Sequence, residues 1–109
     1  MPARQKLRGA LILVGALCCL GGKASQPKVA TIILDKLAFG PAPAGLHVGD
    51  TVEWVNRDIF QHSATASAGG FDVLLPPGGH GRAVLRRAGT IAYYCRFHPG
   101  MKGQLNVSR

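Results

Sequence analysis

The sequence predicts an all-β fold, an antiparallel β-sandwich of six to eight strands. Short segments rich in β-branched and apolar residues recur from Lys28 onward, and Gly and Pro separate them at short intervals. No segment keeps a helical period of apolar residues over a useful length. Evenly spaced short strands with turn signals between them are typical of sandwiches. The chain has 109 residues, 47% of them hydrophobic, which suffices for one small domain and not for two.

The N-terminal segment stands apart because it has the three parts of a secretory signal peptide. A positive stretch, an uncharged apolar run and small residues suited to cleavage follow one another: Arg4, Lys6 and Arg8, then Ala10 to Leu20, then Gly22-Lys23-Ala24. We predict a signal peptide over residues 1–24, with cleavage near Ala24, and one domain over 25–109. The apolar run is shorter than the roughly 20 residues of a membrane-spanning helix, so we expect no stable membrane insertion of the mature domain.

Two alternatives to cleavage remain, an uncleaved anchoring segment and a lipid on Cys18 or Cys19. The lipid is the less favoured, because Leu17 precedes the first cysteine where a lipid-attachment site needs a small residue. Cleavage would remove four of the 13 Lys and Arg and none of the five acidic residues, which lowers the net charge from +8 to +4. The basic residues that remain are scattered, and we expect no nucleic-acid partner. We expect the chain to be periplasmic or otherwise exported.

The strands of the mature chain are expected in this order: 29–34, 51–56, a segment that carries His62, 71–75, 82–87, 90–95 and 103–107. Along 51–56 the side chains of Val52, Trp54 and Asn56 share one face, and Trp54 is expected in the core. Along the strand that ends at Cys95, alternation turns Ile91, Tyr93 and Cys95 inward and Tyr94 outward.

A loop near the C-terminus carries a possible metal site. Its sequence Cys95-Arg96-Phe97-His98-Pro99-Gly100-Met101 has the spacing C-x-x-H-x-x-M, which places a thiol, an imidazole and a thioether on one short loop. These soft and borderline ligands suit copper, and zinc does not use Met. Cleavage would also leave Cys95 as the only thiol in an oxidising compartment, where a metal would protect it.

A second imidazole would complete a set of two His and one Cys with a weak axial thioether, which is the blue-copper arrangement. His47, His62 and His80 are the candidates. We favour His62, because it follows the Trp54 strand at the start of a further strand, and ligands on rigid elements are held better. His80 lies in Gly-Gly-His-Gly, which we interpret as a flexible turn.

The order of these features resembles the cupredoxins, the plastocyanin and pseudoazurin class, and the compact ligand loop looks most like that of amicyanin. The matching residues are Gly49-Asp50-Thr51-Val52, Trp54, Asn56, Asp58, His62-Ser63, Pro77-Gly78, Gly89, Tyr93, Cys95, His98, Met101 and Gly103. The resemblance implies a Greek-key sandwich of about eight strands, with one type 1 copper ion bound by His62, Cys95, His98 and Met101. It also implies that His98 is the ligand nearest the surface. The segment between His62 and Cys95 is shorter than in those relatives, and Leu85 replaces a usual aromatic residue.

The function expected from these features is single-electron transfer by a monomeric carrier, and not catalysis. The partners would be other redox proteins: a dehydrogenase, a cytochrome or an oxidase. Storage or delivery of copper by the same ligands is the alternative, and a metal-free adhesion domain is a third interpretation. We expect the backbone N–H of Ser63 to donate to the Cys95 sulfur and Asn56 to brace the ligand loop.

The expected surface for electron transfer surrounds His98 and includes Phe97, Pro99 and Tyr94, with Gly100 and a proline at position 41 or 43 as further candidates. A small apolar patch is enough for a transient redox complex. Arg96 and Lys102 flank this patch, and their positive charge predicts a partner with acidic residues at its rim.

Overall fold

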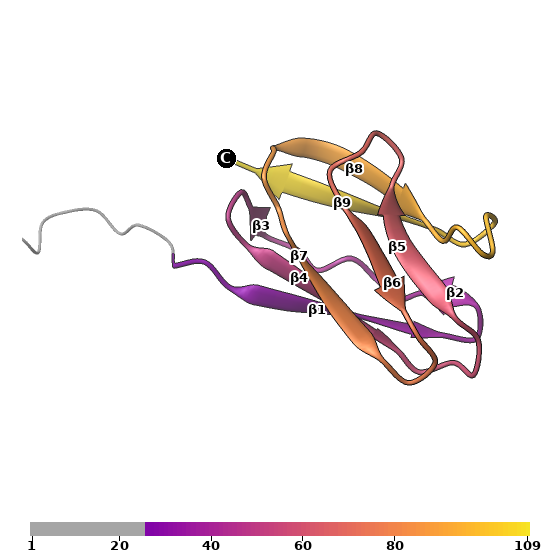
Figure 1. Ribbon diagram of the computed structural model, residues 1–109. Helices are drawn as coiled ribbons and strands as arrows, with labels where there is room; N and C mark the ends of the chain where they lie inside the picture. The colour runs from indigo at the N-terminus through magenta and orange to yellow at the C-terminus, as the bar shows by residue number, and fades with distance from the viewer. Residues whose placement is uncertain (1–25) are drawn as a thin grey trace, which may run out of the picture.

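The computed structural model describes residues 26–109, and the predicted signal segment 1–24 lies outside the described residues. The described chain forms nine strands in two sheets that pack face to face (Figure 1). One sheet has the order β2-β1-β4-β7 and the other the order β3-β9-β8-β5-β6. The strands are β1 Val29–Asp35, β2 Ala38–Phe39, β3 Leu46–His47, β4 Thr51–Asn56, β5 His62–Ala66, β6 Asp72–Leu75, β7 His80–Val84, β8 Gly89–Tyr94 and β9 Lys102–Ser108.

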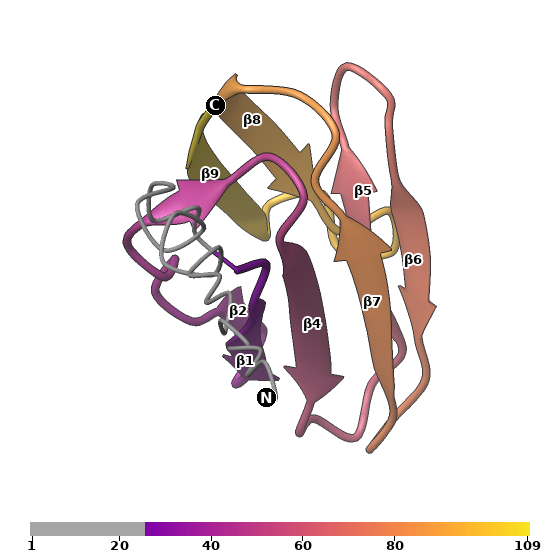
Figure 2. The same cartoon turned by 90° about the vertical axis from the view of Figure 1, so that its left-hand side faces the viewer.

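The predicted sandwich is confirmed, but its sheets are mixed instead of wholly antiparallel. Strand β1 runs parallel to β4 over six residue pairs, and β3 runs parallel to β9. Parallel neighbours need a crossover connection instead of a hairpin. Here the chain leaves the first sheet after β2, adds β3 to the second sheet and returns to β4. Figure 2 shows β1 and β4 side by side in the first sheet. Among the described residues no helix is long and apolar enough to span a bilayer.

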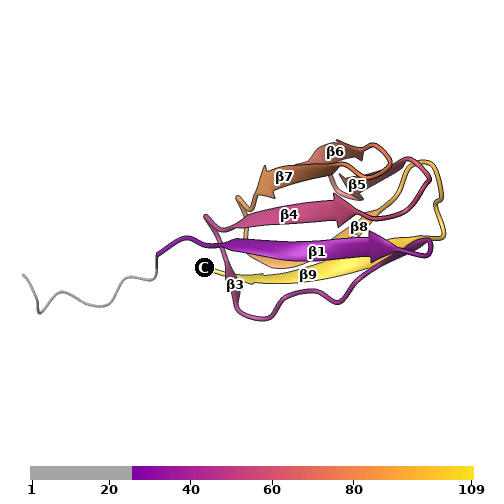
Figure 3. The same cartoon turned by 90° about the horizontal axis from the view of Figure 1, so that it is seen from below.

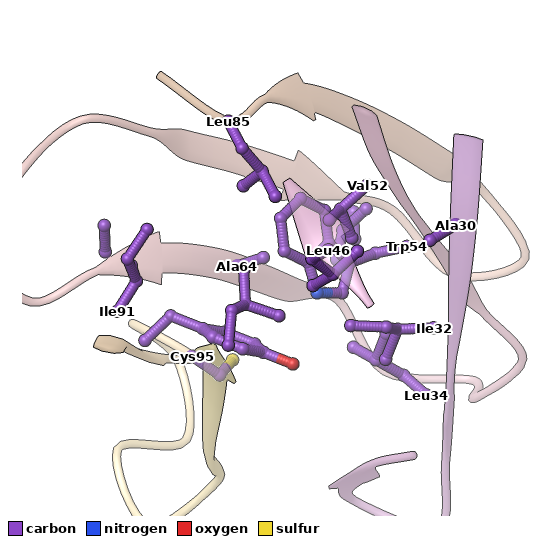
Figure 4. Packing of buried hydrophobic residues seen from close by; sticks show 14 of the residues in the cluster. Ala30, Ile32, Leu34, Leu46, Val52, Trp54, Ala64, Leu85, Ile91 and Cys95 are labelled. Atoms are coloured by element: carbon purple, nitrogen blue, oxygen red, sulfur yellow. The ribbon is translucent and has the colours of Figure 1, made fainter. Parts of the chain in front are cut away.

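The core follows from the alternation of side chains along the strands. Trp54 is fully buried, as predicted, and its ring packs against those of Phe71 and Tyr93, with centroids 5.2 and 5.6 Å away. Tyr93 and Cys95 belong to the same buried core, in which Figure 4 labels Cys95. The thiol therefore lies in the core at the end of β8 and not on an exposed part of the loop.

Strand β7 begins earlier than expected, and His80 is its first residue instead of part of a turn. Local sequence favoured a turn through Gly79 and Gly81, but pairing with β4 sets Trp54 opposite Gly81 and Val55 opposite His80. Glycine is needed here because a Cβ at position 81 would overlap the Val73 side chain. The tertiary contact thus overrides the local turn signal.

Different strand ends and loops lie at the two ends of the sandwich. Strand β8 ends at Tyr94 and β9 begins at Lys102, so the loop 95–101 between them lies at one end. Strands β1 and β4 begin, and β9 finishes, at the opposite end (Figure 3). Because β4 ends at Asn56 and β5 begins at His62, the connection between those strands also lies at the end of the 95–101 loop.

Candidate metal centre

Three of the predicted ligands meet at this end of the sandwich. His62 is the first residue of β5, Cys95 directly follows β8, and His98 lies three residues further along the loop. One donor atom from each lies within 4.8 Å of the other two. The Cys95 Sγ is 3.6 Å from Nδ1 of His62 and 3.8 Å from Nδ1 of His98. Both imidazoles therefore turn the same ring nitrogen toward one thiol.

Met101, the fourth predicted ligand, closes the loop that carries two of the others. Its backbone N–H donates to the His98 carbonyl at 2.8 Å, and its carbonyl accepts from the Cys95 N–H at 3.1 Å. The residue is buried, with 6% of its surface exposed. These two bonds hold the three donor-bearing residues of the loop in one compact turn.

The orientation of His62 is set by Asp58. The imidazole is completely buried, and its Nε2 lies 2.8 Å from Oδ2 of Asp58. A ring N–H at Nε2 that donates to the carboxylate leaves a lone pair on Nδ1, the atom that faces Cys95. A carboxylate behind an imidazole is a common support of metal-ligating histidines. This role of Asp58 was not predicted from the sequence, because residues four apart meet regularly only on a helix and this segment is a loop.

Asp58 is itself held by the turn between β1 and β2. The backbone N–H groups of Lys36 and Leu37 donate to its two oxygens at 2.7 and 2.9 Å. Both turn residues have positive φ, 53° and 61°, which is unusual for residues other than glycine. Burial raises the pKa of Asp58, but the bonds from Leu37, His62 and Lys36 outweigh it and hold the pKa below its ordinary value. The carboxylate is thus kept ionised beside His62.

The Cys95 sulfur accepts a hydrogen bond from the Ser63 backbone N–H at 3.4 Å, as expected. Asn56 braces a different segment from the one expected. Its Nδ2 donates to the carbonyls of Phe60 and Leu75 at 2.8 and 3.0 Å, and its Oδ1 accepts from the Asp58 N–H. Asn56 therefore supports the connection that carries Asp58 and leads to His62, and not the loop 95–101.

The other two candidate histidines lie away from this group. His47 belongs to β3 at the opposite end, where its Nδ1 is 3.0 Å from the Gly45 carbonyl. His80 lies 3.1 Å from the Glu53 carboxylate on the outer side of the first sheet. Of the three candidate histidines, His62, the one favoured from the sequence, is therefore the one that lies beside Cys95.

Exposed apolar side chains surround the outer edge of the centre. His98 is half-buried, whereas His62 is inaccessible. The Phe60 ring meets the His98 ring edge to face at 5.9 Å, and Ile59 and Phe97 are 82% and 42% exposed. We call Ile59, Phe60 and Phe97 the apolar face. The first two were missed from the sequence, because only the fold brings their loop beside His98.

The charge next to this face is smaller than expected. The Nε of Arg96 lies 3.0 Å from the Asp72 carboxylate, and its guanidinium lies 5.3 Å from the centre of the Phe97 ring. Arg96 is thus a paired charge and not a free one. Among the described residues Lys102 forms no ion pair, so it keeps its full charge at the edge of the loop.

Comparison with known proteins identifies the family. No family model matches the chain. Plastocyanin of Scenedesmus fuscus is 35% identical to it over 85 residues, which cover 65% of this chain and 87% of plastocyanin. The chain belongs to the cupredoxins. As a cupredoxin of the plastocyanin and amicyanin type, it belongs with electron carriers and not with enzymes.

Solved structures of amicyanin resemble this cupredoxin over most of the described chain. A point mutant of amicyanin in its reduced state has 29% sequence identity and a TM-score of 0.62, covering 73% of this chain and 82% of amicyanin. The Cu(I) form of another amicyanin mutant has 26% identity and a TM-score of 0.64, covering 79% and 87%. The donors of this cupredoxin, two imidazoles facing one thiol, match the preference of copper for soft and borderline ligands.

Proposed function

We propose that this cupredoxin binds one copper ion through His62, Cys95, His98 and Met101 and shuttles single electrons between redox proteins. The observation that carries the proposal is the approach of two Nδ1 atoms to one Sγ, at 3.6 and 3.8 Å. Bound copper would supply the one-electron change between Cu(II) and Cu(I). The set of two His, one Cys and a Met is the one that blue-copper sites use.

The protein's part in this function is to keep the ligands still. Asp58 fixes the ring of His62, and the backbone bonds of Met101 fix the loop that carries Cys95 and His98. Ligands that hold their positions in both oxidation states keep reorganisation small, so transfer needs no bond to form or break. The Ser63 N–H stabilises negative charge on the Cys95 sulfur.

The route for electrons would run through His98 to the apolar face. This imidazole combines contact with the thiol and exposure at the surface. Exposed apolar side chains around it allow close approach of a partner without desolvation of charge. Tyr94, which is half-buried next to Cys95, offers a second route through the thiolate side.

The partners would be exported redox proteins, a dehydrogenase, a cytochrome or an oxidase, that meet a monomeric carrier briefly. The pairing of Arg96 with Asp72 leaves Lys102 and Arg57, which form no ion pair among the described residues, as the free charges beside this face in sequence, so steering by an acidic partner would be modest. Association rates that fall only slightly between low and high salt would agree with this charge distribution.

Copper binding is tested by titrating the purified protein, cleared of metal, with Cu(II). We expect one equivalent to produce an intense visible thiolate-to-copper band and Cys95→Ser to abolish it. His47→Ala, at the other end of the sandwich, should leave the band unchanged. A colourless copper complex would support storage or delivery instead, and the absence of binding would overturn the proposal.

Electron transfer through the apolar face is tested by the rate of self-exchange between oxidised and reduced copies. This measurement needs no knowledge of the natural partner. Ile59→Asp should lower the rate at least tenfold, because it places a charge where two copies must meet. The matched control is Val84→Asp, which adds the same charge at an exposed apolar residue of β7 near the opposite end. Equal rates in both variants would exclude this face.

A further inference from the structure

A closed ring of hydrogen bonds lies beside the proposed ligands. The Arg96 backbone N–H donates to Ser63 Oγ at 2.9 Å, and the hydroxyls of Ser63 and Thr65 are 2.8 Å apart. Thr65 Oγ1 donates to Oδ1 of Asp72 at 2.8 Å, and the Nε of Arg96 donates to the same oxygen at 3.0 Å. The ring therefore starts and ends at Arg96.

The direction of each bond in the ring is determined. Thr65 gives its only hydroxyl proton to Asp72, so its oxygen must accept from the Ser63 hydroxyl. Ser63 in turn accepts from the Arg96 N–H. Every donor thus points along the ring toward one carboxylate, and such chains strengthen their members by mutual polarisation.

The ring lies where the backbone ladder stops. Strands β5 and β8 pair only through Thr65 with Tyr94 and Ala66 with Tyr93. Beyond Thr65, toward the centre, the link between these strands passes through the Ser63 N–H to the Cys95 sulfur and the Arg96 N–H to the Ser63 hydroxyl. The bond from Arg96 to Ser63 in the ring thus continues the link between the two strands beyond the end of the ladder.

We infer that Asp72, acting through Thr65, Ser63 and Arg96, is a positioning residue that holds the Ser63 N–H on the Cys95 sulfur and so tunes the copper potential. This inference rests on the proposed copper function, although the ring itself is independent of the metal. Asp72 does not touch any proposed ligand. It is exposed, so its effect on the centre passes through the ring and not through packing.

The sign of the expected change in reduction potential follows from the charge on the sulfur. An N–H that donates to the sulfur stabilises the electron-rich reduced site more than the oxidised one, and hydrogen bonds around the sulfur are known to adjust such potentials. A loosened ring should therefore lower the reduction potential. It should also expose the Ser63 and Arg96 amides to exchange with solvent.

The test uses Thr65→Val, which keeps the shape of the side chain and removes the central hydroxyl, and Asp72→Ala, which removes the exposed carboxylate. We expect Thr65→Val, which changes no charge, to lower the potential of the copper protein relative to the unsubstituted chain, whereas Asp72→Ala, which also removes a negative charge, is judged by amide exchange alone. In the metal-free protein both should speed exchange of the Ser63 and Arg96 amides about tenfold, as expected for loss of one hydrogen bond.

Thr90→Val is the matched control, because the Thr90 hydroxyl bonds to the Asn106 side chain on the exposed face of β8. It should change neither the potential nor the two amides. Unchanged exchange in both variants would overturn the inference, as would faster exchange in Thr65→Val with an unchanged potential, which indicates a structural role only. Failure of the copper proposal would instead appear as a missing visible band in the unsubstituted protein.

Discussion

The Asp58 carboxylate lies 2.8 Å from Nε2 of His62, the ring nitrogen that faces away from Cys95. Asp58 is fixed in turn by two backbone N–H groups from the turn between β1 and β2. The orientation of a buried ligand therefore depends on a turn more than 20 residues earlier in the chain.

Asp58→Ala should weaken copper binding by about 10- to 100-fold, the usual cost of losing the residue that orients a metal-binding histidine. Competition with a chelator of known affinity measures the change. Asp35→Ala serves as the control. Asp35 is exposed and adjacent to Lys36, and within the described part of the chain its carboxylate forms no hydrogen bond. Equal affinities in the two variants would show that packing alone orients His62.

Asn56→Ala should lower the free energy of unfolding by about 1–3 kcal/mol, because the buried Leu75 carbonyl loses its donor. The variant should also retain copper less well, since Asn56 braces the connection that leads to His62. Chemical denaturation and copper retention on dialysis measure the two effects. Asn106→Ala, at an exposed position of β9, should change neither, and normal retention in Asn56→Ala would remove this residue from the site.

Gly103→Ala should destabilise the fold by about 1–3 kcal/mol, the usual cost of overpacking. Gly103 lies opposite Tyr93 in the ladder, and an added Cβ would overlap the Tyr93 ring and come within 2.5 Å of its hydroxyl oxygen. Gly100→Ala adds the same methyl group to the ligand loop, where no atom beyond its two chain neighbours would lie within 4 Å of it. Thermal unfolding of the two variants compares them directly, and equal stabilities would contradict this account.

The free energy of unfolding should fall as the pH drops from about 4 to about 2. Hydrogen bonds from the Lys28 and His47 N–H groups, and the Lys28 ammonium group, lower the pKa of Asp50 from 3.8 to about 2. A carboxylate with a lowered pKa stabilises the fold above the pKa of the unfolded chain, and this contribution is lost as protonation of the folded state proceeds.

Asp50→Asn should reduce that slope without abolishing it, because the pKa values of Asp58 and Asp72 are also lowered. Denaturation curves at intervals across this pH range measure the slope. The metal-free protein is suitable, since Asp50 lies at the end of the sandwich opposite the ligands. A slope identical to that of the unsubstituted chain would show that Asp50 does not contribute to the pH dependence of stability.

The parts of this structure that were predictable depend on local pattern. Alternation along 51–56 correctly buried Trp54 and Asn56, and the spacing from Cys95 to Met101 placed those residues on one closed loop. What sequence could not provide was contact between distant segments. The proximity of Phe60 to His98 depends on how the two sheets pack, and the bond from Leu37 to Asp58 depends on the pairing of β1 with β4; no local period encodes either contact.

His80 shows the same limit of local sequence patterns, because its surroundings predicted a turn where the structure has a strand. Three glycines around it favoured a turn, yet β4 recruits the segment as a strand because Gly81 allows the close approach of Val73. The mixed sheets could not be predicted from local sequence either, because the sequence of a strand does not indicate whether its neighbour runs parallel or antiparallel. Pairing of Val29–Leu34 with Thr51–Asn56 decides it.

The separation of the two ends has a practical consequence for attachment. Strand β1 begins at Val29 and β9 ends at Ser108, and Figure 3 shows the start of β1 and the C-terminus together at the end opposite the ligand loop. A tether or a fusion joined near either residue would therefore hold the molecule upright, with His98 and the apolar face directed away from the support. An electrode coated in this way would present a uniformly oriented layer, whose current would report on partner docking without obstruction by the linker.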